Sequence, residues 1–136
     1  MKASEEGKKR FSSETRGESF RHAFSGLAAI AHSEPNLKIH LGIFCLVVIA
    51  GFVLNISLCS WMAISLASGL VLTAECFNTA LEQLSDAIKP DYDPGIKKVK
   101  DIAAAGVLVS AIISVAVGLL VFIPEILQLL SAIFRN

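Results

Sequence analysis

Apolar residues fill three long stretches of the chain, and no Asp, Glu, Lys or Arg interrupts them. The stretches are Leu41 to Cys59, Leu58 to Ala74 and Ile102 to Ile123. A helix needs about 20 mainly apolar residues to cross the hydrocarbon of a bilayer, and fewer where polar ends reach the interface. The pattern therefore predicts three transmembrane helices, over about residues 37–57, 58–88 and 96–123.

A different pattern precedes the first span. Apolar residues recur there at i, i+3, i+4 and i+7 spacing, at Phe20, Ala23, Phe24, Leu27 and Ala31. This spacing predicts an amphipathic helix over residues 19–32, which is too short to cross a bilayer and suited to lie on its surface. The alternative is that this helix packs against the spans. We expect residues 1–17, which are charged and carry Ser and Gly, to form a disordered cytoplasmic tail.

Composition supports one membrane domain. The chain has 136 residues, 54% of them hydrophobic and 18% charged, with a mean hydropathy of +0.64. A soluble domain of this length carries more charge and shorter apolar runs. The predicted fold class is an all-α membrane protein, with residues 18–136 as its single membrane domain. The formal net charge is zero, so charge indicates no nucleic-acid partner.

Lys and Arg are unevenly spread between the loops, which predicts orientation. Seven precede the first span, none lies in residues 55–60, four lie between the second and third spans, and Arg135 alone follows the third. Cytoplasmic loops carry an excess of Lys and Arg, so we expect a cytoplasmic N-terminus and an external C-terminus. The three cysteines are scattered, with no C-x-x-C spacing, and no disulfide framework or zinc site is expected.

Polar residues at the end of the second span fall on one helical face. Glu75, Asn78, Glu82 and Asp86 lie within about 80° of one another, along a stripe about 16 Å long. Carboxylates stacked at i and i+4 repel unless cations or donors neutralise them. Hard carboxylate and amide oxygens suit Mg²⁺, which proteins usually hold by one or two carboxylates together with substrate phosphates.

Further charged residues reach the same depth. Glu34 precedes the Pro35 break at the base of the first span, and Lys100 and Asp101 are the last charges before the third. A lysine could steady phosphates, and a carboxylate free of metal could accept a proton from a hydroxyl. The alternative is a solvated helix end without chemistry. That alternative gives no reason for the acids to share one face.

These residues resemble a known family, the small integral-membrane lipid kinases of prokaryotes, which comprise diacylglycerol kinase and undecaprenol kinase. The family signature E-x-x-N-[ST]-A-[IL]-E-x-x-[VI]-D is matched by residues 75–86, with Ser85 in place of the apolar residue before Asp86. A lysine–aspartate pair followed by small residues matches at residues 100–107, and residues 36–40 look like the Asn-aromatic-Arg-Ile-His of many Gram-positive members. Asp93 stands where a histidine often follows the loop tyrosine.

The resemblance implies an ATP-dependent kinase that works as a homotrimer in the bacterial cytoplasmic membrane. It implies that Glu75 is the general base for the lipid hydroxyl, and that Glu34 and Glu82 bind Mg²⁺ with the ATP phosphates. Asn78, Lys100 and Asp101 would position nucleotide or catalytic groups, and Asp86 would support the adenosine side.

Two other classes compete with the kinase. A small ion- or proton-coupled transport subunit could use the same carboxylates, although it would favour charges nearer the middle of the membrane. A non-catalytic assembly protein needs only the Gly, Ala and Ser faces of the spans, and leaves the acids unexplained. The choice between diacylglycerol and undecaprenol stays open, with residues 36–40 favouring undecaprenol slightly.

Overall fold

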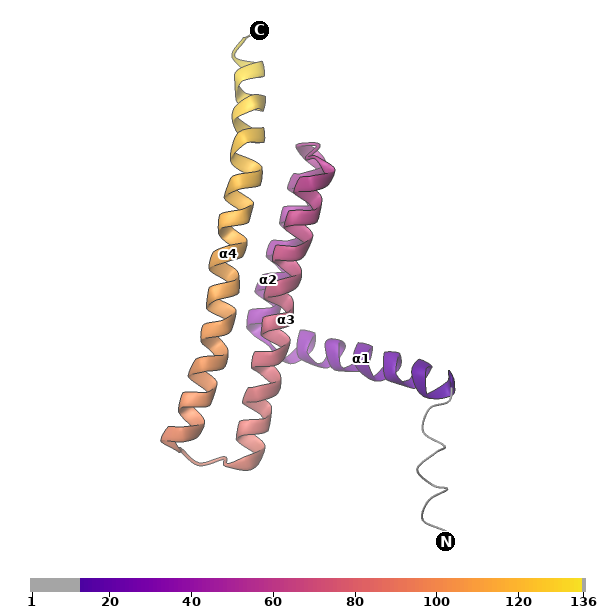
Figure 1. The fold of residues 1–136 in the computed structure, drawn as a ribbon, viewed down its shortest axis with the longest axis vertical. Coiled ribbons are helices and arrows are strands. Elements are labelled where there is room, and N and C mark those ends of the chain that lie inside the picture. The colour runs from indigo at the N-terminus through magenta and orange to yellow at the C-terminus, as the bar shows by residue number, and fades with distance from the viewer. Residues whose placement is uncertain (1–12, 136) are drawn as a thin grey trace. The chain divides into compact units, whose positions relative to one another are not determined.

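The computed structural model describes residues 13–135, and all regular structure in that range is α-helix. The helices are α1 (Ser13–Ser33), α2 (Pro35–Val53), α3 (Leu58–Ile88) and α4 (Pro94–Ile133). α1 belongs to a separate unit that ends at Ser33, and the unit from Glu34 onward holds the other three. Within this second unit α3 packs against both α2 and α4, and each is antiparallel to its neighbour in sequence (Figure 1).

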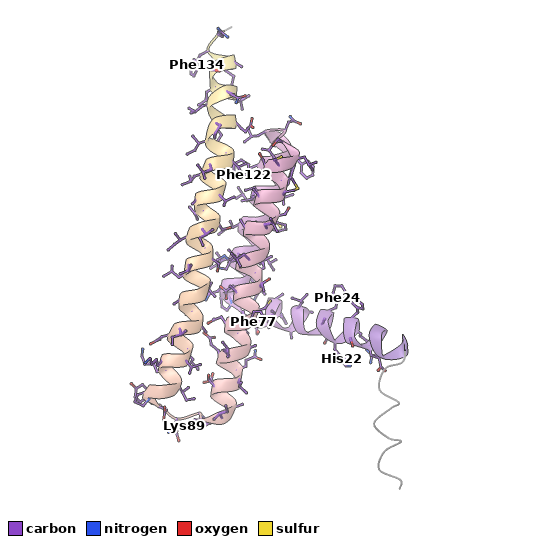
Figure 2. All side chains as sticks on the ribbon, viewed as in Figure 1. His22, Phe24, Phe77, Lys89, Phe122 and Phe134 are labelled. Carbon is purple, nitrogen blue, oxygen red and sulfur yellow. The ribbon has the colours of Figure 1, made fainter. Side chains whose placement is uncertain are left out.

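α2, α3 and α4 are each long and apolar enough to cross a membrane. They have 19, 31 and 40 residues. Large apolar side chains project outward from all three, with Leu66 76% and Leu120 77% exposed (Figure 2). Such surfaces are stable in lipid or against another apolar surface, and not in water. The predicted all-α class with three membrane-capable helices is therefore confirmed.

The turn between α2 and α3 is closed by an asparagine. Asn55 has a positive φ of 51°, a conformation that asparagine adopts more readily than most residues. The Ile56 N–H donates to the Gly51 carbonyl at 3.2 Å and the Asn55 N–H to the Phe52 carbonyl at 3.3 Å, which is the Schellman pattern for a helix C-terminus. Ser57 then caps α3, because its hydroxyl accepts from the Ser60 N–H at 3.2 Å.

Trp61 packs back across this turn onto α2. Its ring lies 4.9 Å from the Phe52 ring, centroid to centroid, at an interplanar angle of 52°. Gly51 is buried beneath it, and a methyl group there would come within 2.7 Å of the Trp61 ring. The absence of a side chain at Gly51 thus lets the two helices approach closely.

The loop between α3 and α4 is set by its own capping residue. The Asp93 carboxylate accepts from the backbone N–H groups of Gly95 at 2.7 Å and Ile96 at 3.1 Å, and Pro94 occupies the first turn of α4. Lys89 donates to the same carboxylate at 2.5 Å. These contacts lower the pKa of Asp93, with the Lys89 hydrogen bond as the largest cause and the two backbone donors after it.

Helix ends differ from the expected ones by more than two residues in three places. α1 begins at Ser13, where a disordered tail over residues 1–17 was expected, because Glu14, Arg16 and Glu18 are tolerated in a helix without an apolar stripe. The first 12 residues of that tail lie outside the described range. α2 ends at Val53 and not near residue 57. α4 continues through Pro124, the expected stop, to Ile133, because the flanking apolar residues continue the helix and one missing donor is tolerated.

Candidate active site

Glu75 is the most deeply buried acid of the polar stripe. Its residue is 3% exposed, and its carboxylate Oε1 lies 3.1 Å from Nε2 of His40 on α2. This separation between nitrogen and oxygen is within the range of a polar contact between the two side chains. The other oxygen, Oε2, accepts no hydrogen bond from the described residues and is not fully enclosed. One carboxylate oxygen of Glu75 therefore contacts His40, and the other has no hydrogen-bond partner among the described residues.

Asn78 and Glu82 form the middle of the stripe. The Asn78 Nδ2 donates to Glu82 Oε1 at 3.1 Å, one helical turn away. Asn78 is 7% exposed, and its Oδ1 is enclosed without a hydrogen-bond partner among the described residues. An unpaired buried acceptor costs about 1–3 kcal/mol. An amide oxygen in this state, beside a carboxylate, is a fitting donor set for a hard cation such as Mg²⁺.

The far end of the stripe is tied to α4. Lys100 Nζ donates to Asp86 Oδ1 at 2.5 Å, with the two side chains 32% and 63% exposed. Lys97 pairs in the same way with Asp101, at 2.6 Å within α4. Ion pairs this exposed contribute little to stability, so they leave their lysines and carboxylates free to exchange partners.

Glu34 sits apart from the stripe in sequence, at the N-cap of α2. It is half-buried, and its side chain does not cap that helix. In residues 13–135 there is no group of three or more His, Cys, Asp or Glu side chains placed to hold one metal ion. Mg²⁺ commonly needs only one or two carboxylates beside phosphates and water, so the assignment of Glu34 and Glu82 to Mg²⁺ stays a prediction.

Some buried polar residues were not singled out from the sequence. In the sequence His40 is only the last residue of the resemblance over residues 36–40, and its contact with Glu75 depends on how α2 packs on α3. Thr79 on α3 is 3% exposed and Ser110 on α4 is 4% exposed. Ser110 donates to the Gly106 carbonyl of its own helix at 2.7 Å, which satisfies the hydroxyl locally. The burial of Thr79 follows from its position one turn beyond Glu75.

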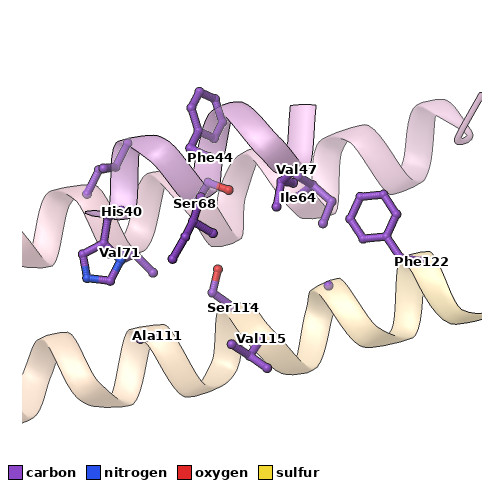
Figure 3. Close-up of a pocket in the computed structure, with 13 residues that line it drawn as sticks. His40, Phe44, Val47, Ile64, Ser68, Val71, Ala111, Ser114, Val115 and Phe122 are labelled. Atoms are coloured by element: carbon purple, nitrogen blue, oxygen red, sulfur yellow. The ribbon is translucent and has the colours of Figure 1, made fainter. Parts of the chain in front are cut away.

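Two cavities flank α3. The first, of about 210 Å³, lies between α2, α3 and α4 and is almost wholly apolar, with His40 at one end and Phe122 at the other (Figure 3). Ser68 and Ser114 are its other polar lining residues. The second, of about 300 Å³, lies between α3 and α4 and is lined by Asn78 and Ser110 among apolar side chains. Among the described buried polar residues of α3, Asn78 lines the second cavity, and Glu75 is joined to the first through its contact with His40.

An all-helical chain with three membrane-capable helices and a set of acid–base pairs around the end of one of them is an integral membrane protein with the elements of an enzyme site. The profile of the family described as prokaryotic diacylglycerol kinase matches residues 21–122. The chain belongs to this family, which confirms the resemblance. It is accordingly a lipid kinase, a phosphotransferase with an alcohol group as acceptor.

Two curated relatives agree with this assignment. The undecaprenol kinase of Bacillus subtilis is 40% identical over 108 residues, which cover 79% of this chain and 88% of the relative. The diacylglycerol kinase of Synechocystis is 34% identical over 113 residues, which cover 82% of this chain and 65% of that relative. The family and its membrane-capable helices identify a multi-pass bacterial membrane protein.

Proposed function

We propose that this chain transfers the γ-phosphate of ATP to the hydroxyl of a membrane lipid, undecaprenol or diacylglycerol, at the cytoplasmic face of the membrane. The observation that carries the proposal is the buried Glu75 carboxylate, held by His40 on one oxygen and open on the other. Burying an ionised carboxylate costs folding free energy, so a carboxylate in this position is a candidate for a functional role. One such role is that of a general base that takes the proton of a hydroxyl group.

The acceptor lipid is a long apolar molecule with one reactive hydroxyl. The first cavity supports such a ligand, because its walls are apolar along α2, α3 and α4 and its His40 end lies beside Glu75. A lipid tail between the helices would bring the hydroxyl to the polar end. We favour undecaprenol as the better acceptor, because the relative aligned over most of its length is an undecaprenol kinase.

In the reaction the lipid oxygen bonds to the γ-phosphorus of ATP while the bond from that phosphorus to the bridging oxygen breaks, and ADP leaves. Glu75 Oε2 accepts the hydroxyl proton as the new bond forms. Glu82 and Glu34 would hold Mg²⁺, and the unpaired Asn78 Oδ1 lies on the residue whose amide nitrogen donates to Glu82. Bound Mg²⁺ offsets the negative charge of the phosphates.

The nucleotide is assigned to the polar end of α3 and the start of α4. Lys100 is the cation there, and its exposed pair with Asp86 can open to let the ammonium bind a phosphate oxygen. Asp86 then supports the adenosine side, and Asp101, paired with Lys97, positions groups near the phosphates.

The topology and assembly complete the proposal. The Lys and Arg excess before α2 and between α3 and α4 supports a cytoplasmic N-terminus and an external C-terminus. We infer that α1 lies on the membrane surface. A homotrimer, with each site shared between subunits, is consistent with the exposed apolar faces of α2, α3 and α4.

Transfer of labelled phosphate from ATP in detergent micelles tests the function, with undecaprenol and diacylglycerol offered separately and Mg²⁺ present. Label in a lipid, lost in Glu75→Gln, is the expected result. Label in both lipids would assign a permissive acceptor site. No label in either lipid, from folded protein, would refute the proposal and favour a transport subunit.

A further inference from the structure

His40 has no assigned role, yet it makes the closest polar contact of the proposed base. Its Nε2 lies 3.1 Å from Glu75 Oε1, and the two side chains are 22% and 4% exposed. No other hydrogen bond or ion pair of the described residues reaches the Glu75 carboxylate. The carboxylate is at the end of a flexible side chain, so this single contact decides where it points.

Among residues 13–135, Glu75 is the one charged side chain that forms an ion pair with His40. Toward α4, the cavity that His40 lines is bounded by Ala111, Ser114 and Gly118, none of which carries charge. Toward α3 its lining is Ser68, Val71 and Leu72 before the chain reaches Glu75. The imidazole therefore lies at the polar end of an apolar space (Figure 3), and its Nε2 contacts Glu75 there.

We propose that His40 is the positioning residue of this kinase: its Nε2 holds Glu75 Oε1, which leaves Oε2 for the hydroxyl of a lipid whose tail occupies the adjoining cavity. The inference rests on the proposed kinase function. His40 itself touches neither reacting atom. It acts by occupying Oε1, which leaves Oε2 as the oxygen that takes the proton, and by holding α2 and α3 together at this level.

The test compares two amides at position 40. A glutamine amide nitrogen reaches about as far as Nε2, whereas an asparagine amide nitrogen ends near the place of Nδ1 and cannot reach Glu75. Displacing a reacting group by about 1 Å costs on the order of 10²-fold in rate. We expect His40→Asn to lower kcat by about that factor and His40→Gln to keep most of it, with the KM for ATP unchanged in both.

Each outcome bears on the inference. Equal turnover of the Asn and Gln variants, whether high or low, would overturn it, because only a donor that reaches Glu75 should distinguish them. Should His40→Asn fail to fold, His40→Ala takes its place in the same comparison with Gln. His22→Gln on α1, an exposed histidine, is the matched control and should behave as wild type.

The two proposals fail in distinguishable ways. If the wild type transfers no phosphate to either lipid, the kinase function falls. If the wild type is active, Glu75→Gln is inactive and His40→Asn retains full turnover, only the role of His40 falls.

Discussion

The close approach of α2 and α3 at Gly51 allows a quantitative test of the helix packing. A Cβ atom at this position would lie 2.7 Å from Cη2 and 2.9 Å from Cζ2 of Trp61, and 3.1 Å from Cδ1 of Ile56. Carbon atoms pack at about 3.5–4.0 Å, so the methyl group of Gly51→Ala overlaps the indole by nearly 1 Å. The Phe52 ring restricts any shift of the indole, because the two rings pack in a tilted arrangement with their centroids 4.9 Å apart.

Overpacking of this kind costs typically about 1–3 kcal/mol. We therefore expect Gly51→Ala to lower the free energy of unfolding by about this amount, measured by denaturant titration in a mild detergent. Gly42→Ala on the same helix is the control. No side chain lies within 4 Å of a Cβ there, and replacing a helical glycine by alanine should stabilise by about 0.5–1 kcal/mol.

A double-mutant cycle assigns the cost to the indole. Trp61→Leu removes both ring atoms that meet the new methyl group, so in that background Gly51→Ala should be nearly neutral. The coupling between the two sites is then most of the single-mutant cost. If Gly51→Ala costs the same with and without Trp61, or costs nothing in the wild type, the packing of Trp61 on Gly51 is refuted.

Three further variants probe the site and the loop beside it. Asn78→Ala removes a hydrogen bond to a charged group, worth about 1.5–3 kcal/mol, together with an unpaired acceptor that costs about 1–3 kcal/mol, so stability should change little. Phosphate transfer should nevertheless fall, and unchanged transfer would count against Asn78 as a site residue. Lys100→Ala should cost less than about 1 kcal/mol of stability, because its pair with Asp86 is exposed, while raising the KM for ATP; an unaltered ATP dependence would contradict its role. The lowered pKa of Asp93 means that its ionised form stabilises the fold above the unfolded-state pKa, and that this contribution is lost as pH falls through the folded-state value. The stability difference between wild type and Asp93→Asn should accordingly shrink below about pH 4, measured by unfolding at stepped pH, and a difference that stays constant with pH would contradict this role of Asp93.

Local signals decided how well the helices were predicted. α3 was expected over residues 58–88 and spans Leu58–Ile88, because a serine cap opens it and Lys89-Pro90 closes it. α2 ends earlier than expected because Asn55 turns the chain while Ile56 is still apolar, and an apolar count does not detect a turn of one residue. α4, in contrast, is longer than expected: it was expected to end at residue 123, just before Pro124, and it continues to Ile133. A proline interrupts a helix less strongly in an apolar setting than in water.

The residues that α3 contributes to the candidate site could be predicted from the sequence pattern, whereas their contacts with partners on α2 and α4 could not. The spacing of Glu75, Asn78, Glu82 and Asp86 on one face follows from helix geometry alone, and the Asn78–Glu82 contact is such an i,i+4 pair. The partners His40 and Lys100 come from other helices. Which side chain meets which across two helices depends on their rotation and register, and one sequence does not specify either.

The two ends of the polar stripe on α3 contact different helices, and the kind of side chain changes along the stripe from one end to the other. Glu75, at the apolar end, contacts α2 beside the cavity suited to a lipid tail. Asp86, eleven residues and about 16 Å further along α3, contacts α4 through Lys100. Asn78 and Glu82, the pair with an unused amide oxygen, lie between them. A hydroxyl-bearing lipid arriving from the membrane and a phosphate donor arriving from water would meet at this middle pair, where a cation between phosphates and carboxylates is most needed. On the proposed function, the single helix α3 would order along its axis the base, the metal ligands and the carboxylate that pairs with Lys100 of α4, which would account for acids that share one face yet contact different helices.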